Sequence, residues 1–175
     1  MVESNALIED ILKQHRGELN IDYDKYRNHV YRVFNFTLLL YDADKKDTDA
    51  LAVAAAFHDI GIWTAGTMDY LAPSVALAKE YIKAKKLKIS DEWVEEIILN
   101  HHKVTAYQDN PMADAFRRAD LVDLTLGVAS QGISHRDILQ LFQTFPEAGF
   151  HLFIMKEVAL SALRNPFNPL PIFKW

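Results

Sequence analysis

The residues of this chain that could do chemistry are histidines and aspartates placed within apolar stretches. The clearest case is the pair His58-Asp59, which ends the alanine-rich run 52–57 shortly before Gly61. Because small alanines let neighbouring helices approach closely, the run predicts a buried helix, and the pair at its end should be buried with it. Holding a lone carboxylate ionised inside a protein costs roughly several kcal/mol unless it is paired or binds a metal. The pair therefore calls for further ligands.

Metal-competent side chains recur on other predicted helices. His29 lies on the apolar stripe of a helix predicted over residues 26–41. His101 and His102 end a helix predicted to start at Ser90. Asp120 and Asp123 lie one turn apart on the helix that follows. Two imidazoles and two carboxylates balance a divalent cation and leave room for water, which suits Mn, Fe, Co, Ni or Zn. The chain has no cysteine, so any metal site must use nitrogen and oxygen ligands.

The central helix has to end at the His-Asp pair for this prediction to work. Neighbouring residues on a regular helix do not face each other, so His58 and Asp59 could not share a metal there. Gly61 indicates that the helix ends at this point, which removes the objection. At the other end, a residue among Asp47 to Asp49 is predicted to cap the helix.

Apolar residues recur at steps of three and four along most of the chain, and no convincing alternating strand pattern accompanies them. We therefore expect an all-α fold, a bundle of about seven to eight helices, in a single domain over residues 1–175. The tail 166–175 contains three prolines and ends in Ile-Phe-Lys-Trp. It is apolar enough that we expect it to pack back on the body.

The charge pattern limits the partners. The formal net charge is −5, and acidic and basic residues are interspersed, which argues against nucleic acid and against an anionic membrane as partners. No apolar run is long enough to span a bilayer, and the first ten residues lack a signal-peptide core, so we expect a cytoplasmic protein. A small anionic substrate remains possible with local positive charge. The aromatic tail could pack within its own chain or against a second copy, so a homo-oligomer is one possibility.

The order His29, His58-Asp59, Asp120 resembles the H…HD…D signature of the HD-domain superfamily of metal-dependent phosphohydrolases. The resemblance is strongest over residues 25–127, and residues 128–175 are then C-terminal helices and the packed tail. It implies an HD-domain-like helical bundle. The similar segments are 28–33, 57–61, 98–102 and 117–120, and the metal ligands implied for one divalent ion are His29, His58, Asp59 and Asp120.

The resemblance also implies, for many members, a histidine near position 101 or 102 that serves a second metal or a phosphate. Asp120 is preferred to Asp123 because the last aspartate of the signature follows an alanine, as Asp120 does. Two-metal members carry a further histidine between the His-Asp pair and the later one, and none lies between His58 and His101. One metal is therefore expected, with Asp69 or Glu80 as the substitutes if there are two.

Three branches of the superfamily are not matched. Alarmone hydrolases and small deoxynucleotidases carry a glutamate shortly after the His-Asp pair, where this chain has Ile62 and Trp63. The cyclic-dinucleotide branch follows its paired histidines with glutamate and a Gly-Tyr-Pro segment, where this chain has residues 103–105, Lys-Val-Thr. The substrate therefore stays unnamed at this level.

The expected activity is hydrolysis of a small phosphorylated metabolite or nucleotide, with the metal polarising a phosphoryl oxygen and lowering the pKa of a water. Asp59 could orient that water. His101 or His102, with one of three cationic residues, could meet the developing phosphoryl charge. The three cations considered are Arg32, Lys103 and Arg117, and the candidate catalytic residues are Asp59, His101, His102 and Arg117. Segment 63–70, with Trp63 and Tyr70, is the candidate substrate wall.

Other functions remain open at this stage. The same scaffold could carry an iron oxygenase, which would take up oxygen, or a metal-dependent hydratase. A non-catalytic metal- or ligand-binding module would bind tightly without turnover. A helical interaction protein would use the inward histidines only to satisfy its core.

Overall fold

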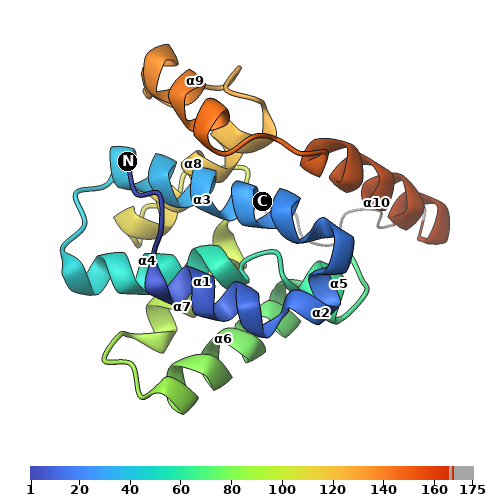
Figure 1. Ribbon diagram of the computed structural model, residues 1–175, viewed down its shortest axis with the longest axis horizontal. Helices are drawn as coiled ribbons and strands as arrows, with labels where there is room; N and C mark the ends of the chain where they lie inside the picture. The colour runs from blue at the N-terminus through green and yellow to red at the C-terminus, as the bar shows by residue number, and fades with distance from the viewer. Residues whose placement is uncertain (166, 168–175) are drawn as a thin grey trace.

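Helix α4 (Lys45–Phe57) runs through the middle of the structure, a computed structural model that describes residues 1–165 and 167 (Figure 1). It contacts α1, α3, α6 and α7, and every residue from Ala50 to Phe57 is buried. The buried central helix is thus confirmed. Its cap was predicted wrongly: the side chain of Asp44 accepts a hydrogen bond from the backbone N–H of Asp47 at 2.8 Å, because the helix begins earlier than the residues proposed.

Helices make up all the regular secondary structure of the described residues, and no strand occurs among them. The elements are α1 (Ala6–Gln14), α2 (Arg16–Leu19), the 3-10 helix η1 (Asn20–Asp22), α3 (Tyr23–Leu40), α4, α5 (Gly61–Thr64), α6 (Leu71–Lys85), α7 (Asp91–Asn100), α8 (Pro111–Leu124), α9 (His135–Thr144) and α10 (Phe150–Arg164). The predicted all-α fold is confirmed. Of the described helices, eight have nine or more residues, which agrees with the expected seven to eight.

Four helices bring the candidate residues together. Helix α3 packs against α8 and α4, and α7 packs against α4 and α8, so these helices meet in the interior. Local sequence fixes where two of them begin. Ser90 caps α7 by accepting from the N–H of Trp93 at 3.2 Å. Asn110 caps α8 by accepting from Met112, and Pro111 occupies its first turn, where a missing N–H costs nothing.

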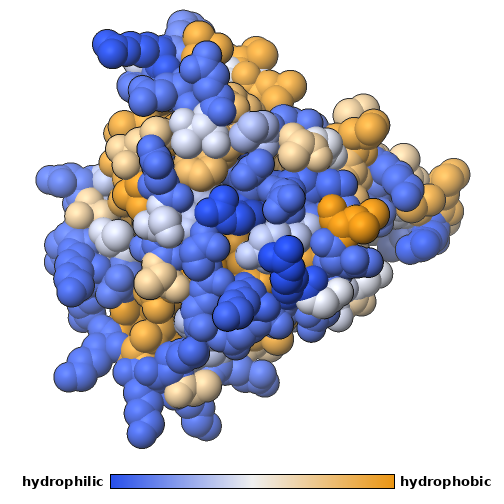
Figure 2. Space-filling view, in the orientation of Figure 1, coloured by the Kyte–Doolittle hydropathy of each residue, from blue (hydrophilic) through white to orange (hydrophobic). Residues whose placement is uncertain are grey.

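The last two helices lie outside this central group. Ser134 caps α9 by accepting from the N–H of Asp137, and α10 extends along one edge of the molecule (Figure 1). Exposed apolar residues gather toward that edge (Figure 2), among them Leu152, Met155 and Leu163 of α10. No described helix combines the length and apolar character that crossing a bilayer requires. The predicted packing of the tail falls on residues outside those described, apart from Phe167, which is exposed.

Candidate metal centre

The His-Asp pair lies in a tight turn between two helices. Helix α4 ends at Phe57, the N–H of Ile60 bonds back to the carbonyl of Phe57 at 3.2 Å, and α5 starts at Gly61. This break lets both His58 and Asp59 face the interior. Gly61 is required by close approach, since a Cβ there would lie 2.5 Å from the carbonyl oxygen of Tyr70.

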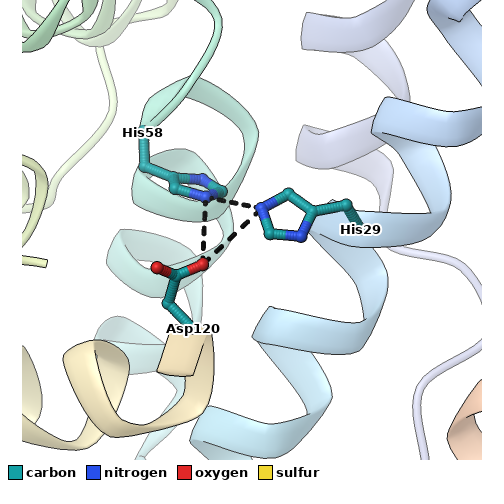
Figure 3. A group of neighbouring side chains, drawn as sticks. All are labelled: His29, His58 and Asp120. Carbon is teal, nitrogen blue, oxygen red and sulfur yellow. Dashed lines mark hydrogen bonds and ion pairs between the residues drawn. The ribbon is translucent and has the colours of Figure 1, made fainter. Parts of the chain in front are cut away.

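Three side chains from different helices converge on one point (Figure 3). His29 comes from the middle of α3, His58 follows α4, and Asp120 comes from α8. The Nε2 atoms of His29 and His58 lie 2.9 Å apart, and Oδ1 of Asp120 lies 3.7 and 3.9 Å from them. Oδ2 of Asp59 lies 3.5 Å from each Nε2 atom. The structure thus gathers the four residues that the HD resemblance implies as metal ligands.

The hydrogen bonds on the outer side of each ring decide which nitrogen faces inward as an acceptor. Nδ1 of His58 donates to the carbonyl of Ala55 at 2.7 Å, and Nδ1 of His29 lies 2.7 Å from the carboxylate of Asp123. In the neutral rings both Nε2 atoms then carry lone pairs that point at each other. Two ligands bound at about 2.1 Å to one ion at a right angle lie about 3 Å apart, close to the 2.9 Å observed.

Unpartnered buried atoms concentrate at the same place. Among the described residues, the buried side-chain polar atoms without a hydrogen-bond partner are Asp59 Oδ1, Asp120 Oδ1, His101 Nε2 and His15 Nδ1. Three of these four line the cluster, although buried polar groups are normally paired. A cation is the partner that acceptor atoms of this kind require. The donor set of imidazole and carboxylate groups therefore fits a divalent ion such as Mn, Fe, Co, Ni or Zn.

The electrostatics of the cluster also favour a cation. Burial lowers the pKa of His58 to about 3 and raises the pKa of the Asp120 carboxyl. Burial would also lower the pKa of His29, but its hydrogen bonds to Asp123 and Asp59 outweigh burial and raise that pKa to about 9. A proton on His29 then takes part of the role that a bound cation would fill. The charges of Asp59 and Asp120 together match one divalent ion.

His101 and His102 form a second half of the cluster. Nδ1 of His101 donates to the carbonyl of Ile98 at 2.7 Å, and its Nε2 lies 3.3 Å from Oδ1 of Asp59. Nδ1 of His102 lies 3.9 Å from Oδ2 of Asp120. Each of the two carboxylates thus directs one oxygen to the first pair of histidines and the other oxygen to the second pair. Three overlapping groups could hold a metal: His29, His58 and Asp120; His58, Asp59 and His101; and His101, His102 and Asp120.

The residues proposed as substitutes for an intervening histidine are elsewhere. Asp69 and Glu80 are both exposed, and neither belongs to a described group that could hold a metal. The two aromatic residues of the predicted substrate wall, Trp63 and Tyr70, lie in different places. Tyr70 is buried, and its hydroxyl lies 2.6 Å from Nε2 of His102. Trp63 instead stacks on Phe153 with ring centroids 4.9 Å apart, away from the pocket lining.

A pocket of about 200 Å³ opens beside the second half of the cluster. Two of its lining residues are cationic, Lys103 and Arg117, as an anionic substrate requires. The Arg117 guanidinium is held by Asp114, with Nη2 2.8 Å from Oδ1 of that carboxylate. The pocket is lined by His101, His102, Lys103, Val104, Arg117, Asp120, Leu121 and Leu124.

Arg32 is not at this pocket, so the prediction that it could meet a phosphoryl group was wrong. It is fully buried and donates to the Asp123 carboxylate through Nε and through Nη2, the latter at 3.0 Å. A buried guanidinium needs a buried carboxylate, and Asp123 supplies it. Asp123 therefore has two roles: it forms a structural ion pair with Arg32, and it orients the ring of His29.

The family model of the HD domain matches residues 26–125, more than half of the chain. The chain belongs to the HD-domain family. No curated protein and no solved structure gives a significant match. All four residues implied as ligands lie within the matched range, as do His101, His102 and Arg117.

Two contacts of this HD domain escaped sequence reasoning. The pair Arg32 and Asp123 could have been found, because Arg32 lies one turn after His29 and Asp123 one turn after Asp120. On two packed helices, each ligand is thus followed by a residue on its own face. Phe150, which stacks on His29 from outside the family match, gives no such signal.

Proposed function

We propose that this HD-domain protein is a metal-dependent phosphohydrolase that acts on a small phosphorylated metabolite or nucleotide. One observation carries the proposal: the Nε2 atoms of His29 and His58 face each other at 2.9 Å beside two buried carboxylates, next to a pocket that contains two cations. An interaction module would not need unpartnered acceptors in its core, because each costs about 1–3 kcal/mol of desolvation.

The ligands of the ion are His29, His58, Asp59 and Asp120. A bound divalent ion would supply Lewis acidity, polarising a phosphoryl oxygen and lowering the pKa of the attacking water. Oδ1 of Asp59 lies 3.3 Å from Nε2 of His101, and Asp59 orients that water by accepting a hydrogen bond from it.

The pocket residues act on the substrate. Burial would lower the pKa of His101, but its contact with Asp59 outweighs burial and raises that pKa, which favours the charged ring. A positive His101, together with Arg117 and Lys103, would stabilise the negative charge that builds up on the phosphoryl group. His102 borders the same pocket and is fixed by Tyr70.

The test measures phosphate release from a panel of phosphomonoesters, including nucleoside monophosphates and sugar phosphates. Protein stripped by chelation and reloaded with Mn²⁺, Co²⁺, Ni²⁺, Zn²⁺ or Fe²⁺ is compared with stripped protein. Asp59→Asn is expected to abolish turnover, and Arg117→Gln to raise KM more than it lowers kcat, because Arg117 acts on substrate charge. Metal-loaded protein that releases no phosphate from any ester contradicts the proposal.

A second function is favoured by one specific observation. Asp59 and Asp120 each face both pairs of histidines, so the cluster could hold two ions that share these carboxylates. Two irons would make an oxygenase the better assignment. About two irons per chain with oxygen uptake would support that alternative, whereas about one ion per chain with phosphate release supports the phosphohydrolase.

Two other functions would give different results in the same assays. A metal-dependent hydratase would add water to its substrate without releasing phosphate, and a binding module would bind without turnover. We propose a small anionic substrate as the partner, and neither nucleic acid nor membrane, in keeping with the net charge of −5. The exposed apolar face of α10 could pack against a second copy of this chain in a homo-oligomer.

A further inference from the structure

Residues beyond the family match contact His29, the proposed metal ligand on α3. His29 is fully buried, and its ring stacks on the ring of Phe150, with centroids 4.0 Å apart and planes inclined by 14°. Phe150 is itself fully buried and begins α10, beyond the last matched residue, 125. The stacked ring limits tilting of the imidazole, and the hydrogen bond from Nδ1 to Asp123 limits its rotation.

Asp123 is in turn prevented from moving. Arg32 binds both oxygens of its carboxylate, in the two-pronged geometry that fixes a carboxylate best. The third arm of the guanidinium, Nη1, donates to the carbonyls of Phe145 and Pro146 at 2.8 and 3.1 Å. The orientation of His29 therefore depends, through two side chains, on the backbone that connects α9 to α10.

Two more contacts fasten residues 145–151, which comprise the α9–α10 connection and the first two residues of α10, to the matched helices. Nδ2 of Asn28, next to His29 on α3, donates to the carbonyl of Pro146 at 2.8 Å. Nε2 of His151 donates to the backbone carbonyl of Asp123 on α8 at 2.8 Å. Residues 145–151 thus bond to α3, which carries His29, and to α8, which carries Asp123. They pack on the side of His29 away from the metal centre.

We propose that Phe150 and the Arg32–Asp123 pair are positioning residues for His29, and that the α9–α10 connection thereby sets how tightly this protein holds its metal. The inference rests on the metal site of the proposed function. Groups that orient a metal ligand typically change metal affinity by about 10- to 100-fold when they are removed. By linkage, a bound metal must stabilise the connection by the same factor that the connection contributes to metal affinity.

The test compares the dissociation constant of Co²⁺ for four proteins that each span residues 1–175, by isothermal titration, each shown to be folded by circular dichroism. Phe150→Ala is expected to bind Co²⁺ about 10- to 100-fold more weakly than the wild type. Phe150→Tyr keeps an aromatic ring on His29 and is expected to restore affinity to within about threefold. Leu141→Ala is the matched control: Leu141 is a buried residue of α9 that borders Asn35 and Leu38, and its loss should leave Co²⁺ affinity unchanged.

A second measurement uses the wild type alone and covers the case in which Phe150→Ala does not fold. Hydrogen exchange of residues 145–151 should slow when Co²⁺ binds, more than exchange in α9 does. Equal Co²⁺ affinity for the wild type and folded Phe150→Ala, or unchanged exchange at 145–151, overturns this inference while the proposed function stands. A wild-type protein that binds no Co²⁺ overturns both.

Discussion

The pKa of His29 makes metal binding depend on pH in a way that can be worked out. Burial lowers this pKa, but the hydrogen bonds to Asp123 and Asp59 outweigh burial and raise it to about 9. A metal must bind the neutral ring, so at pH 8 about nine in ten molecules have to release a proton from His29. Loss of the His29 proton should therefore raise the apparent affinity about 10-fold from pH 7 to pH 8, and this contribution should level off above about pH 9.

The assay is isothermal titration with Co²⁺ at pH 8 in two buffers of different ionisation enthalpy, which counts the protons released. We expect about one proton per ion bound. In Asp123→Asn, which lacks one of the carboxylates that raise the pKa of His29, the count should fall, because more rings are neutral before the metal arrives. Tight binding at pH 8 without proton release, and with the same affinity at pH 7, would refute the reasoning.

Three further predictions concern the free energy of unfolding, measured by urea denaturation. Gly61→Ala should lower it by about 1–3 kcal/mol, because the new Cβ meets the Tyr70 carbonyl; no change would contradict the close approach. Arg32→Met should lower it by about 3–5 kcal/mol, since Asp123 is left buried without its cation; a smaller loss would mean that water reaches the carboxylate. In metal-free protein, the raised pKa of His29 contributes stability that is complete below about pH 6.5 and is lost as the pH rises through 9. The free energy of unfolding should therefore fall from pH 6.5 to pH 9.5. A rise over this range would contradict the direction of the pKa shift.

The sequence predicted the all-α fold because helices depend on local patterns, whereas the grouping of His29, His58, Asp59 and Asp120 came from the resemblance to the HD signature. Helical periodicity and capping residues such as Ser90 and Asn110 determine where helices form, and the structure agrees. Gly61 indicated the break after Phe57, and the structure shows why a glycine is needed there: the Tyr70 carbonyl lies against it.

What the sequence could not supply were contacts between segments far apart in the chain. The spacing of Asp123 does not reveal what its carboxylate contacts, and only the packing of α3 on α8 shows that it binds both His29 and Arg32. Arg32 was wrongly considered for the substrate pocket, because a sequence does not reveal which cations are buried. The contact of Phe150 with His29 depends on how α10 starts, and no periodicity encodes it.

The claim that His29, His58, Asp59 and Asp120 hold one divalent ion is tested most directly by crystallography. Protein purified without chelators and reconstituted with Co²⁺ would be crystallised, and anomalous scattering recorded at the cobalt absorption edge. We predict a single anomalous peak at about 2.0–2.2 Å from Nε2 of His29 and of His58, with both carboxylates bound. The two imidazoles still bonded to each other, with no peak between them in fully reconstituted crystals, would contradict the claim.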